Sequence, residues 1–308
     1  MMPTPQADEP ALYPIRTVSN VTGVNAVTLR AWERRYGLIR PHRTPKGHRL
    51  YTKGDIDLIQ EVVDLLGTGV SIGQVRGHLG RGGGVPVQAS LGEGPGADAW
   101  QAYQRRMMAA IERFDEPGLE ADYSEALALY PVDVVTERLV NPLLRALGER
   151  WEGRRGGIAE EHFFATYLRN KLGARLHHLA TQRARSRLLA ACLPGEHHEL
   201  GLLLFCLAAA NHGFGFVVLG ADTPLDEVAS AQARARCDGI VLSGSVDPTP
   251  AVLEALHSLA TGAGVPVLVG GLASSRHEAA IRAAGAHPLG TDLHAVLRRL
   301  PQLVAAAH

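Results

Sequence analysis

Short apolar runs alternate with helix-like patterns in the last 120 or so residues of the chain. Four runs read as buried strands: Arg187–Pro194, Phe214–Gly220, Gly239–Ser243 and Pro266–Gly270. The helices expected between and after them are Gly201–His212, Leu225–Arg236, Ala251–Thr261, His277–Ala284 and Leu293–Leu300. Such alternation is typical of a parallel, doubly wound sheet. Residues 187–308 are therefore predicted to form an α/β, Rossmann-like (flavodoxin-like) domain.

The preceding segment has a helical period throughout. Amphipathic helices are expected at Trp100–Phe114, Leu119–Leu129, Val132–Glu152 and Ala159–Ala180, with turn signals between the first three. Together they predict a four-helix bundle over residues 100–184. Residues 80–99 are rich in glycine, which favours a flexible linker. The part before this linker is then expected to be loosely tethered, with a position that depends on assembly.

The first 79 residues predict a small, separate helical domain with a β-hairpin. A short helix, Ile15–Val21, should turn Val18 and Val21 inward, and Asn25 is a good N-cap for a second helix that ends at Tyr36. A hairpin is expected at His42–Tyr51, followed by helices at Ile56–Leu66 and Ile72–Leu79. Residues 13–79 thus predict a winged helix-turn-helix, after a disordered leader at 1–12.

Charge is balanced over the whole chain, but positive charge is concentrated in residues 13–79, which we call the head. The 308 residues contain 31 Lys or Arg and 31 Asp or Glu. Between Tyr13 and Lys53, nine Lys or Arg face Glu33 alone, a local charge of +8. Such a concentration favours binding to nucleic-acid phosphates.

The strings Thr28-Leu-Arg-Ala-Trp-Glu-Arg-Arg-Tyr-Gly-Leu38 and Gly47-His-Arg-Leu-Tyr51 resemble those of mercury-resistance-type (MerR-type) winged helix-turn-helix domains. The resemblance implies that the second helix approaches the major groove of operator DNA and that the wing touches the backbone and the adjacent groove. The implied DNA-binding residues are Thr28, Arg30, Arg34, Arg35, Arg43, Lys46, His48, Arg49 and Tyr51. Trp32 is expected to fill the core of the head, with a DNA contact as the alternative.

A loop after the first predicted strand of the α/β domain carries candidate metal chemistry. It reads Gly-Glu-His-His-Glu-Leu-Gly from 195 to 201. His198 could present one ring nitrogen to a metal, and Glu196 could hold the other ring N–H. Gly201, without a Cβ, would let a large group approach the backbone. The alternative is a surface loop in which His197 and His198 are only solvated.

Glu196-x-His198-x-x-Gly201 resembles the Asp-x-His-x-x-Gly signature of cobalamin-binding domains. The resemblance makes His198 the lower axial cobalt ligand. It also implies that Ser243-Gly-Ser245 and Gly270-Gly271 line the slot for the nucleotide tail. The chain departs from the signature in having Glu196 for aspartate and Ser245 for the preferred leucine, and neither change removes the ligand.

Trp151, Glu161 and His162 form a second candidate group, in which an indole plane, a carboxylate and an imidazole could cover a nucleoside. Their spacing is similar to that in light-sensing cobalamin repressors of the CarH/LitR type, where the tryptophan packs against the adenosyl group. In those proteins a histidine follows the tryptophan, whereas Glu152 stands here. The alternative is a buried helix-end tryptophan beside a solvated Glu–His pair.

These resemblances imply an adenosylcobalamin-dependent, light-responsive repressor that binds double-stranded operator DNA as an oligomer. By resemblance the dark form is a homotetramer and the lit form a monomer. A light-independent cobalamin-sensing regulator stays open because of Glu152. A methyltransferase or mutase subunit is disfavoured by the basic head and by the lack of a substrate-activating cluster, so the chain is not expected to be an enzyme.

The remaining signals concern location and minor positions. Cys192, Cys206 and Cys237 lie in apolar or helical stretches and form no Cys-x-x-Cys pair, which predicts buried thiols in a reducing compartment. No signal peptide and no apolar run of membrane length is visible, so a cytoplasmic protein is expected. Asp222 is interpreted as a helix cap, and His287 as a surface residue.

Overall fold

The computed structural model of the chain describes residues 11–79, 95–150, 156–180, 184 and 186–305. The chain divides into two compact units. One comprises Met1–Met107 and Pro117–Leu139, and the other comprises Met108–Glu116 and Val140–His308. Within the described segments, no helix combines the length and the apolar character that crossing a membrane requires.

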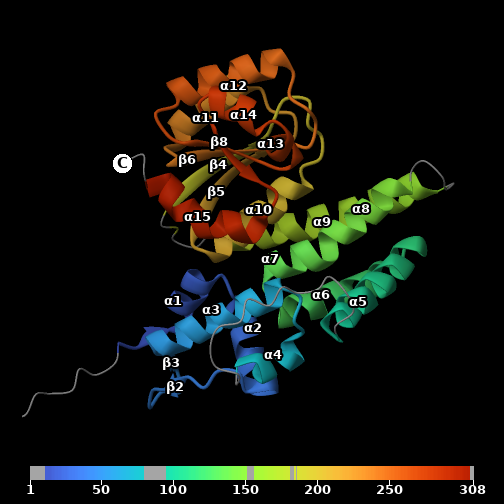
Figure 1. Cartoon of the computed structure of the whole chain (residues 1–308), viewed down its shortest axis with the longest axis vertical. Helices are drawn as coiled ribbons and strands as arrows, with labels where there is room; N and C mark the ends of the chain where they lie inside the picture. The colour runs from blue at the N-terminus through green and yellow to red at the C-terminus, as the bar shows by residue number, and fades with distance from the viewer. Residues whose placement is uncertain (1–10, 80–94, 151–155, 181–183, 185, 306–308) are drawn as a thin grey trace, which may run out of the picture. The chain divides into compact units, whose positions relative to one another are not determined.

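The first unit begins with the predicted winged helix-turn-helix (Figure 1). Its elements are β1 (Tyr13–Pro14), α1 (Ile15–Thr22), α2 (Ala26–Ala31), the π-helical turn η1 (Trp32–Tyr36), β2 (His42–Arg43), β3 (Arg49–Tyr51), α3 (Lys53–Gly67) and α4 (Ile72–Leu79). Asn25 caps α2 by accepting hydrogen bonds from the backbone N–H groups of Val27 and Thr28, both at 2.9 Å. β2 and β3 form the antiparallel wing, and β1 adds a strand on the other side of β3. The predicted hairpin and N-cap are confirmed.

The core of the head forms where its helices meet β3. Val18, Leu29, Trp32 and Tyr51 are completely buried there. The expectation that Trp32 fills the core is therefore confirmed. Val21, expected to point inward, is 45% exposed, because α1 buries only the side of its last turn that carries Val18 and Thr22.

The head is held by helices from later in the chain. The Thr28 hydroxyl donates to the Leu127 carbonyl at 3.3 Å, and Trp32 Nε1 donates to the Leu129 carbonyl at 2.9 Å. Both carbonyls lie at the end of α6 (Glu116–Leu129), within the same unit. Arg138 donates to the Gly67 carbonyl at the end of α3. The expectation of a loosely tethered head is wrong within this unit, because these contacts hold the head against α6 and against Arg138 of the π-helical turn η2.

The middle of the chain is helical, as predicted. Its other helices are α5 (Pro95–Glu112), α7 (Val132–Val135), the π-helical turn η2 (Thr136–Val140), α8 (Asn141–Glu149) and α9 (Gly157–Ala180). α5 begins inside the segment expected to be linker; residues 80–94 of that segment lie outside the described residues. In the second unit, Arg150 joins the end of α5 to the start of α9 through ion pairs with Glu112 at 2.8 Å and Glu160 at 3.3 Å.

The second unit contains the predicted parallel sheet. Its strands are β4 (Ser186–Cys192), β5 (Phe214–Gly220), β6 (Gly239–Ser243), β7 (Val267–Gly270) and β8 (His287–Gly290), in the order β5-β4-β6-β7-β8. The helices are α10 (Leu200–Asn211), α11 (Leu225–Ala235), α12 (Pro250–Gly262), α13 (Leu272–Arg276), α14 (Glu278–Ala283) and α15 (Leu293–Ala305). Figure 1 shows α11, α12 and α14 on one side of the sheet and α10 and α15 on the other. This is the doubly wound, flavodoxin-like order: β5 is added on one side of β4, and β6, β7 and β8 are added on the other.

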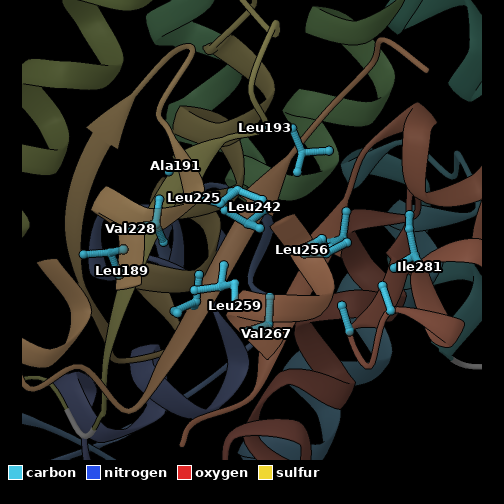
Figure 2. Close-up of a cluster of buried hydrophobic side chains, with 14 of the residues drawn as sticks. Leu189, Ala191, Leu193, Leu225, Val228, Leu242, Leu256, Leu259, Val267 and Ile281 are labelled. Carbon is cyan, nitrogen blue, oxygen red and sulfur yellow. The ribbon is translucent and has the colours of Figure 1, made fainter. Parts of the chain in front are cut away.

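The sheet has an apolar core on each face. Figure 2 shows the larger one, where Leu189 and Leu242 from the strands meet Val228, Leu256 and neighbouring side chains of the covering helices. On the opposite face, Cys192 and Cys206 pack with Ala190 and Leu202. Cys192, Cys206 and Cys237 are buried free thiols, as predicted. Burial raises the pKa of Cys192 to about 12 and raises that of Cys206 further.

Candidate cofactor and DNA-binding sites

The Glu196 loop lies at the topological switch point of the sheet, where the chain passes from β5 on one side of β4 to β6 on the other. It follows β4, and its first residue, Leu193, donates its N–H to the Ser243 carbonyl at the end of β6, at 2.9 Å. The loops after β4 and β6 are therefore neighbours at the carboxyl edge of the sheet. In open parallel sheets this position is the usual ligand-binding crevice.

Glu196 links these two loops through its carboxylate. The side chain is 1% exposed. Oε1 accepts from the His198 N–H at 2.8 Å, and Oε2 accepts from the Ser245 N–H at 2.5 Å, from the Ser245 hydroxyl and from the Val246 N–H at 3.3 Å. Burial alone would raise the pKa of Glu196, but hydrogen bonds from Ser245 and His198 outweigh it and lower the pKa to about 2. The loop therefore contains a buried, ionised carboxylate.

His198 is oriented by this carboxylate. Its Nδ1 lies 2.8 Å from Glu196 Oε1, while its side chain is 68% exposed. Because an ionised carboxylate can only accept, Nδ1 carries the proton in the neutral imidazole. Nε2 then has a free lone pair and points away from the carboxylate. This is the arrangement of a histidine ready to ligate a metal, with the second nitrogen held by an acid.

Glycines keep the surroundings of the loop free of side chains. A Cβ on Gly201 would meet only the Ser243 hydroxyl, at 3.8 Å, so the start of α10 is open toward the end of β6. Gly271 has φ +90°, and a Cβ there would lie 2.4 Å from the Gly244 carbonyl oxygen. Gly271 is thus required by the close approach of the loops after β6 and β7. Gly270 ends β7 beside them.

Two neighbouring acids have roles that the sequence did not reveal. Asp222 does not cap α11, whose N-cap is Pro224; its carboxylate instead accepts from the Gly195 N–H at 2.8 Å and so braces the Glu196 loop. The helix-cap interpretation is wrong. Glu199 pairs with Arg169 of α9 at 2.6 Å, which joins the loop to that helix within the second unit.

The second predicted group is described only in part. Trp151 and Glu152 lie outside the described residues. Glu161 and His162 lie on the first turns of α9, with a carboxylate-to-imidazole distance of 3.8 Å. The His162 side chain is 71% exposed and that of Glu161 is 17% exposed. Both groups are therefore available to a ligand, and their role stays a prediction.

The basic head presents some of its predicted DNA-binding residues and hides others. Arg30, Arg34, Arg35, Lys46 and His48 are exposed. Thr28 and Tyr51 are completely buried, so the structure contradicts their assignment to the DNA surface. Thr28 is buried because its hydroxyl faces the end of α6, and burial in the core of the head raises the pKa of Tyr51 to about 12.

Arg43 and Arg49 of the wing are engaged by Glu33 on η1. The Arg43 Nη2–Glu33 Oε1 distance is 2.8 Å, and the Arg49 Nε–Glu33 Oε2 distance is 2.5 Å. Burial would raise the pKa of Glu33, but the hydrogen bonds from Arg49 and Arg43 outweigh it and hold the pKa below its ordinary value. Glu33 thus fixes the wing against the recognition segment, which comprises α2 and η1 (residues 26–36), and neutralises part of the positive charge of the head.

Comparison with known protein families identifies three segments of the chain. Residues 13–81 match the family described as MerR HTH family regulatory protein. Residues 103–176 and residues 186–294 match two different families, both described as B12 binding domain. The head, the helical segment and the sheet thus each have a family counterpart.

Two curated proteins are similar to the chain over nearly their whole length. The chain is 32% identical to the HTH-type transcriptional repressor CarH of Myxococcus xanthus over 89% of this chain and 94% of that protein. It is 31% identical to the repressor CarA of the same organism, over 88% and 91%. A solved structure, the Methanosarcina barkeri monomethylamine corrinoid protein, covers 66% of this chain and 98% of its own with a TM-score of 0.50 and 19% identity, which is a likeness of fold. The chain therefore belongs to the CarH-type family of MerR transcriptional regulators, in which a winged helix-turn-helix is followed by cobalamin-binding domains.

Proposed function

We propose that the protein is an adenosylcobalamin-dependent, light-responsive transcriptional repressor. It binds operator DNA as an oligomer in the dark and leaves it when light breaks the cobalt–carbon bond of the cofactor. The observation that carries the proposal is the Glu196–His198 pair, an oriented histidine at the ligand edge of a sheet, on the same chain as a basic head. The similarity to two proteins named as repressors supports the direction of regulation.

The donor set fits cobalamin better than a free metal ion. Among the residues that the structure describes, no group of three or more His, Cys, Asp or Glu side chains could hold a metal ion. His198 therefore offers one ligand, which suits a cobalt already held by four ring nitrogens of a corrin. The open backbone at Gly201 suits the approach of such a large ring.

Each part of the site has its own task toward the cofactor. His198 would be the protein ligand of the cobalt, and Glu196 holds its imidazole in the tautomer that leaves Nε2 unprotonated. Ser243, Ser245, Gly270 and Gly271 border the space for the nucleotide tail. Trp151, Glu161 and His162 would hold the adenosyl group, with the Glu161 carboxylate accepting from ribose hydroxyls. When bound, adenosylcobalamin supplies a cobalt–carbon bond that visible light cleaves.

Control of DNA binding follows from avidity. A single head offers few base contacts, so heads joined in one oligomer bind an operator far more tightly than a separate head. Loss of the adenosyl group would leave Trp151 without the group it is proposed to pack against, and would so weaken an interface on which the oligomer depends. Dissociation then lowers operator affinity without changing any contact between a head and DNA.

A regulator that senses cobalamin without responding to light is the second candidate. The sequence feature that favours it is Glu152, at the position where light sensors of this family carry a histidine. In that case the cofactor assembles the oligomer in the dark and in the light alike.

The axial-ligand assignment is tested with His198→Ala and, as a matched control, His197→Ala, since both histidines are exposed and adjacent. Adenosylcobalamin binding is followed by absorbance, and assembly by size-exclusion chromatography in the dark. His198→Ala should lose cofactor-dependent assembly and the spectrum of a histidine-ligated corrinoid, and His197→Ala should keep the spectrum. Cofactor-dependent oligomers of His198→Ala with an unchanged spectrum would contradict the proposal.

A further inference from the structure

One apolar side chain stands out on the recognition segment of the head. Val27 is 60% exposed, the largest exposed fraction among the large hydrophobic residues that the structure describes. It lies in the first turn of α2, and its backbone N–H is one of the two that Asn25 caps. A β-branched residue at an exposed helix position is slightly unfavourable for the helix relative to alanine, so helix propensity does not favour a valine there.

The neighbours of Val27 define which face of the recognition segment is open. Thr28, Leu29 and Trp32 are buried on the other sides of the segment, two of them hydrogen-bonded to the end of α6. Arg30 is exposed, and three residues along a helix brings it next to Val27. Val27 and Arg30 thus form the open face of α2.

The charge around this face matches a DNA duplex. Arg30, Arg34 and Arg35 are exposed along α2 and η1. Among the described residues, Arg30 and Arg34 form no ion pair, in contrast to the wing arginines that Glu33 engages. The Arg30 and Arg34 guanidinium groups can therefore contact DNA phosphates, while the apolar Val27 side chain beside them can contact a base edge.

The first turn of a recognition helix is the part that reaches base edges in the major groove. The only apolar group that a base pair presents there is the 5-methyl group of thymine. We propose that Val27 is a specificity-determining residue that packs against the 5-methyl group of a thymine in each half-site of the operator. The inference rests on the proposed binding of operator DNA by the head and adds the chemistry by which one base is chosen.

The test begins with duplexes selected from a random-sequence pool by the full-length wild-type protein with adenosylcobalamin in the dark. Each thymine of the selected site is then replaced in turn by deoxyuridine, which removes only the methyl group. Affinities of the wild type and of Val27→Ala are measured by fluorescence anisotropy. Burial of one methyl-sized group corresponds to about a three- to fivefold change in affinity per head.

At one thymine per half-site, deoxyuridine should weaken wild-type binding about three- to fivefold per head, and Val27→Ala should weaken binding by a similar factor. Val27→Ala should also be insensitive to deoxyuridine at that position. Val21→Ala is the matched control, an exposed valine of α1 that should leave affinity and methyl dependence unchanged. Because Val27 is exposed, its truncation should not lower the thermal unfolding temperature.

Two results would overturn the inference while leaving DNA binding intact. The first is an equal effect of every deoxyuridine on the wild type and on Val27→Ala, and the second is a selected site without thymine. A wild-type protein that selects no duplex at all would instead contradict the proposed function, and the inference with it.

Discussion

Replacement of Glu196 by glutamine tests how the site prepares its histidine. The carboxylate is buried and accepts hydrogen bonds from His198, Ser245 and Val246. Glutamine keeps the shape but replaces one acceptor oxygen with an N–H₂ donor. If that group faces His198, it donates to Nδ1 and moves the ring proton to Nε2. The variant then presents a protonated nitrogen where cobalt needs a lone pair.

The magnitude for stability follows from the pKa of Glu196. A fall from 4.5 to about 2 corresponds to about 3 kcal/mol of preferential interaction with the ionised form. Because the folded-state pKa is depressed, this stabilisation is present above pH 4.5 and is lost as the pH falls toward 2. Linkage gives a loss of about 2 kcal/mol by pH 3. Glu196→Gln has no such titration, and it leaves at least one donor unpaired, at a cost of about 1–3 kcal/mol at neutral pH.

The assay is urea unfolding of the cofactor-free protein between pH 7 and pH 3, with cobalamin titration at pH 7. Glu196→Gln should be less stable at pH 7, and its free energy of unfolding should fall less with acid than that of the wild type, by about 2 kcal/mol at pH 3. Its cobalamin affinity should be about 10- to 100-fold weaker, as for other groups that orient a metal ligand.

Glu278→Gln is the control, because this exposed carboxylate pairs with Arg282 on the surface of α14. Loss of an exposed pair should change stability by less than about 1 kcal/mol and leave cobalamin binding unaltered. The reasoning is refuted if Glu196→Gln binds cobalamin as tightly as the wild type and follows the same acid-unfolding curve.

Two further predictions concern the residues that brace the sites. Ser245→Ala removes the hydroxyl that donates to Glu196 and should weaken cobalamin binding by up to about tenfold in equilibrium dialysis; unchanged affinity would show that this hydroxyl does not support the site. Glu33→Gln should lower the stability of the head by about 1–2 kcal/mol in urea unfolding, because one of the two oxygens that accept from Arg43 and Arg49 becomes an N–H₂ donor and the negative charge is lost; an unchanged midpoint would contradict its role in fixing the wing.

The sequence was sufficient wherever a local pattern determined the structure. The strands β4, β6 and β7 are apolar runs whose residues are mostly buried, and β5 is an apolar run that is only partly buried. The Glu196–His198 pair was predicted for the same reason, since the two residues are separated by one position in a single loop. Asn25 was recognised as a cap by its residue type alone.

Features that depend on distant residues were not predictable in this way. The resemblance to MerR-type domains places Thr28 on the DNA-binding surface, but its hydroxyl donates to the Leu127 carbonyl, 99 positions away. In the sequence, Ser245 stands out only because it replaces the leucine of the cobalamin-binding signature. In the structure it donates two hydrogen bonds to Glu196, which lies 49 positions earlier in the chain. No local pattern encodes such pairings.

The fifth strand was missed for a different reason. β8 reads His-Pro-Leu-Gly, and proline and glycine are unfavourable in strands. The strand lies at the edge of the sheet, where the missing N–H of Pro288 is tolerated. His287 is exposed, as predicted, at its start.

The central claim is that cofactor and light together control operator binding. The most direct measurement uses protein reconstituted with adenosylcobalamin in the dark, analysed by size-exclusion chromatography and operator gel shift before and after green light. The account predicts a large DNA-binding species in the dark and smaller species with little affinity for the operator after illumination. A cofactor-loaded protein whose size and DNA affinity are the same before and after light would contradict it and favour a light-independent cobalamin regulator.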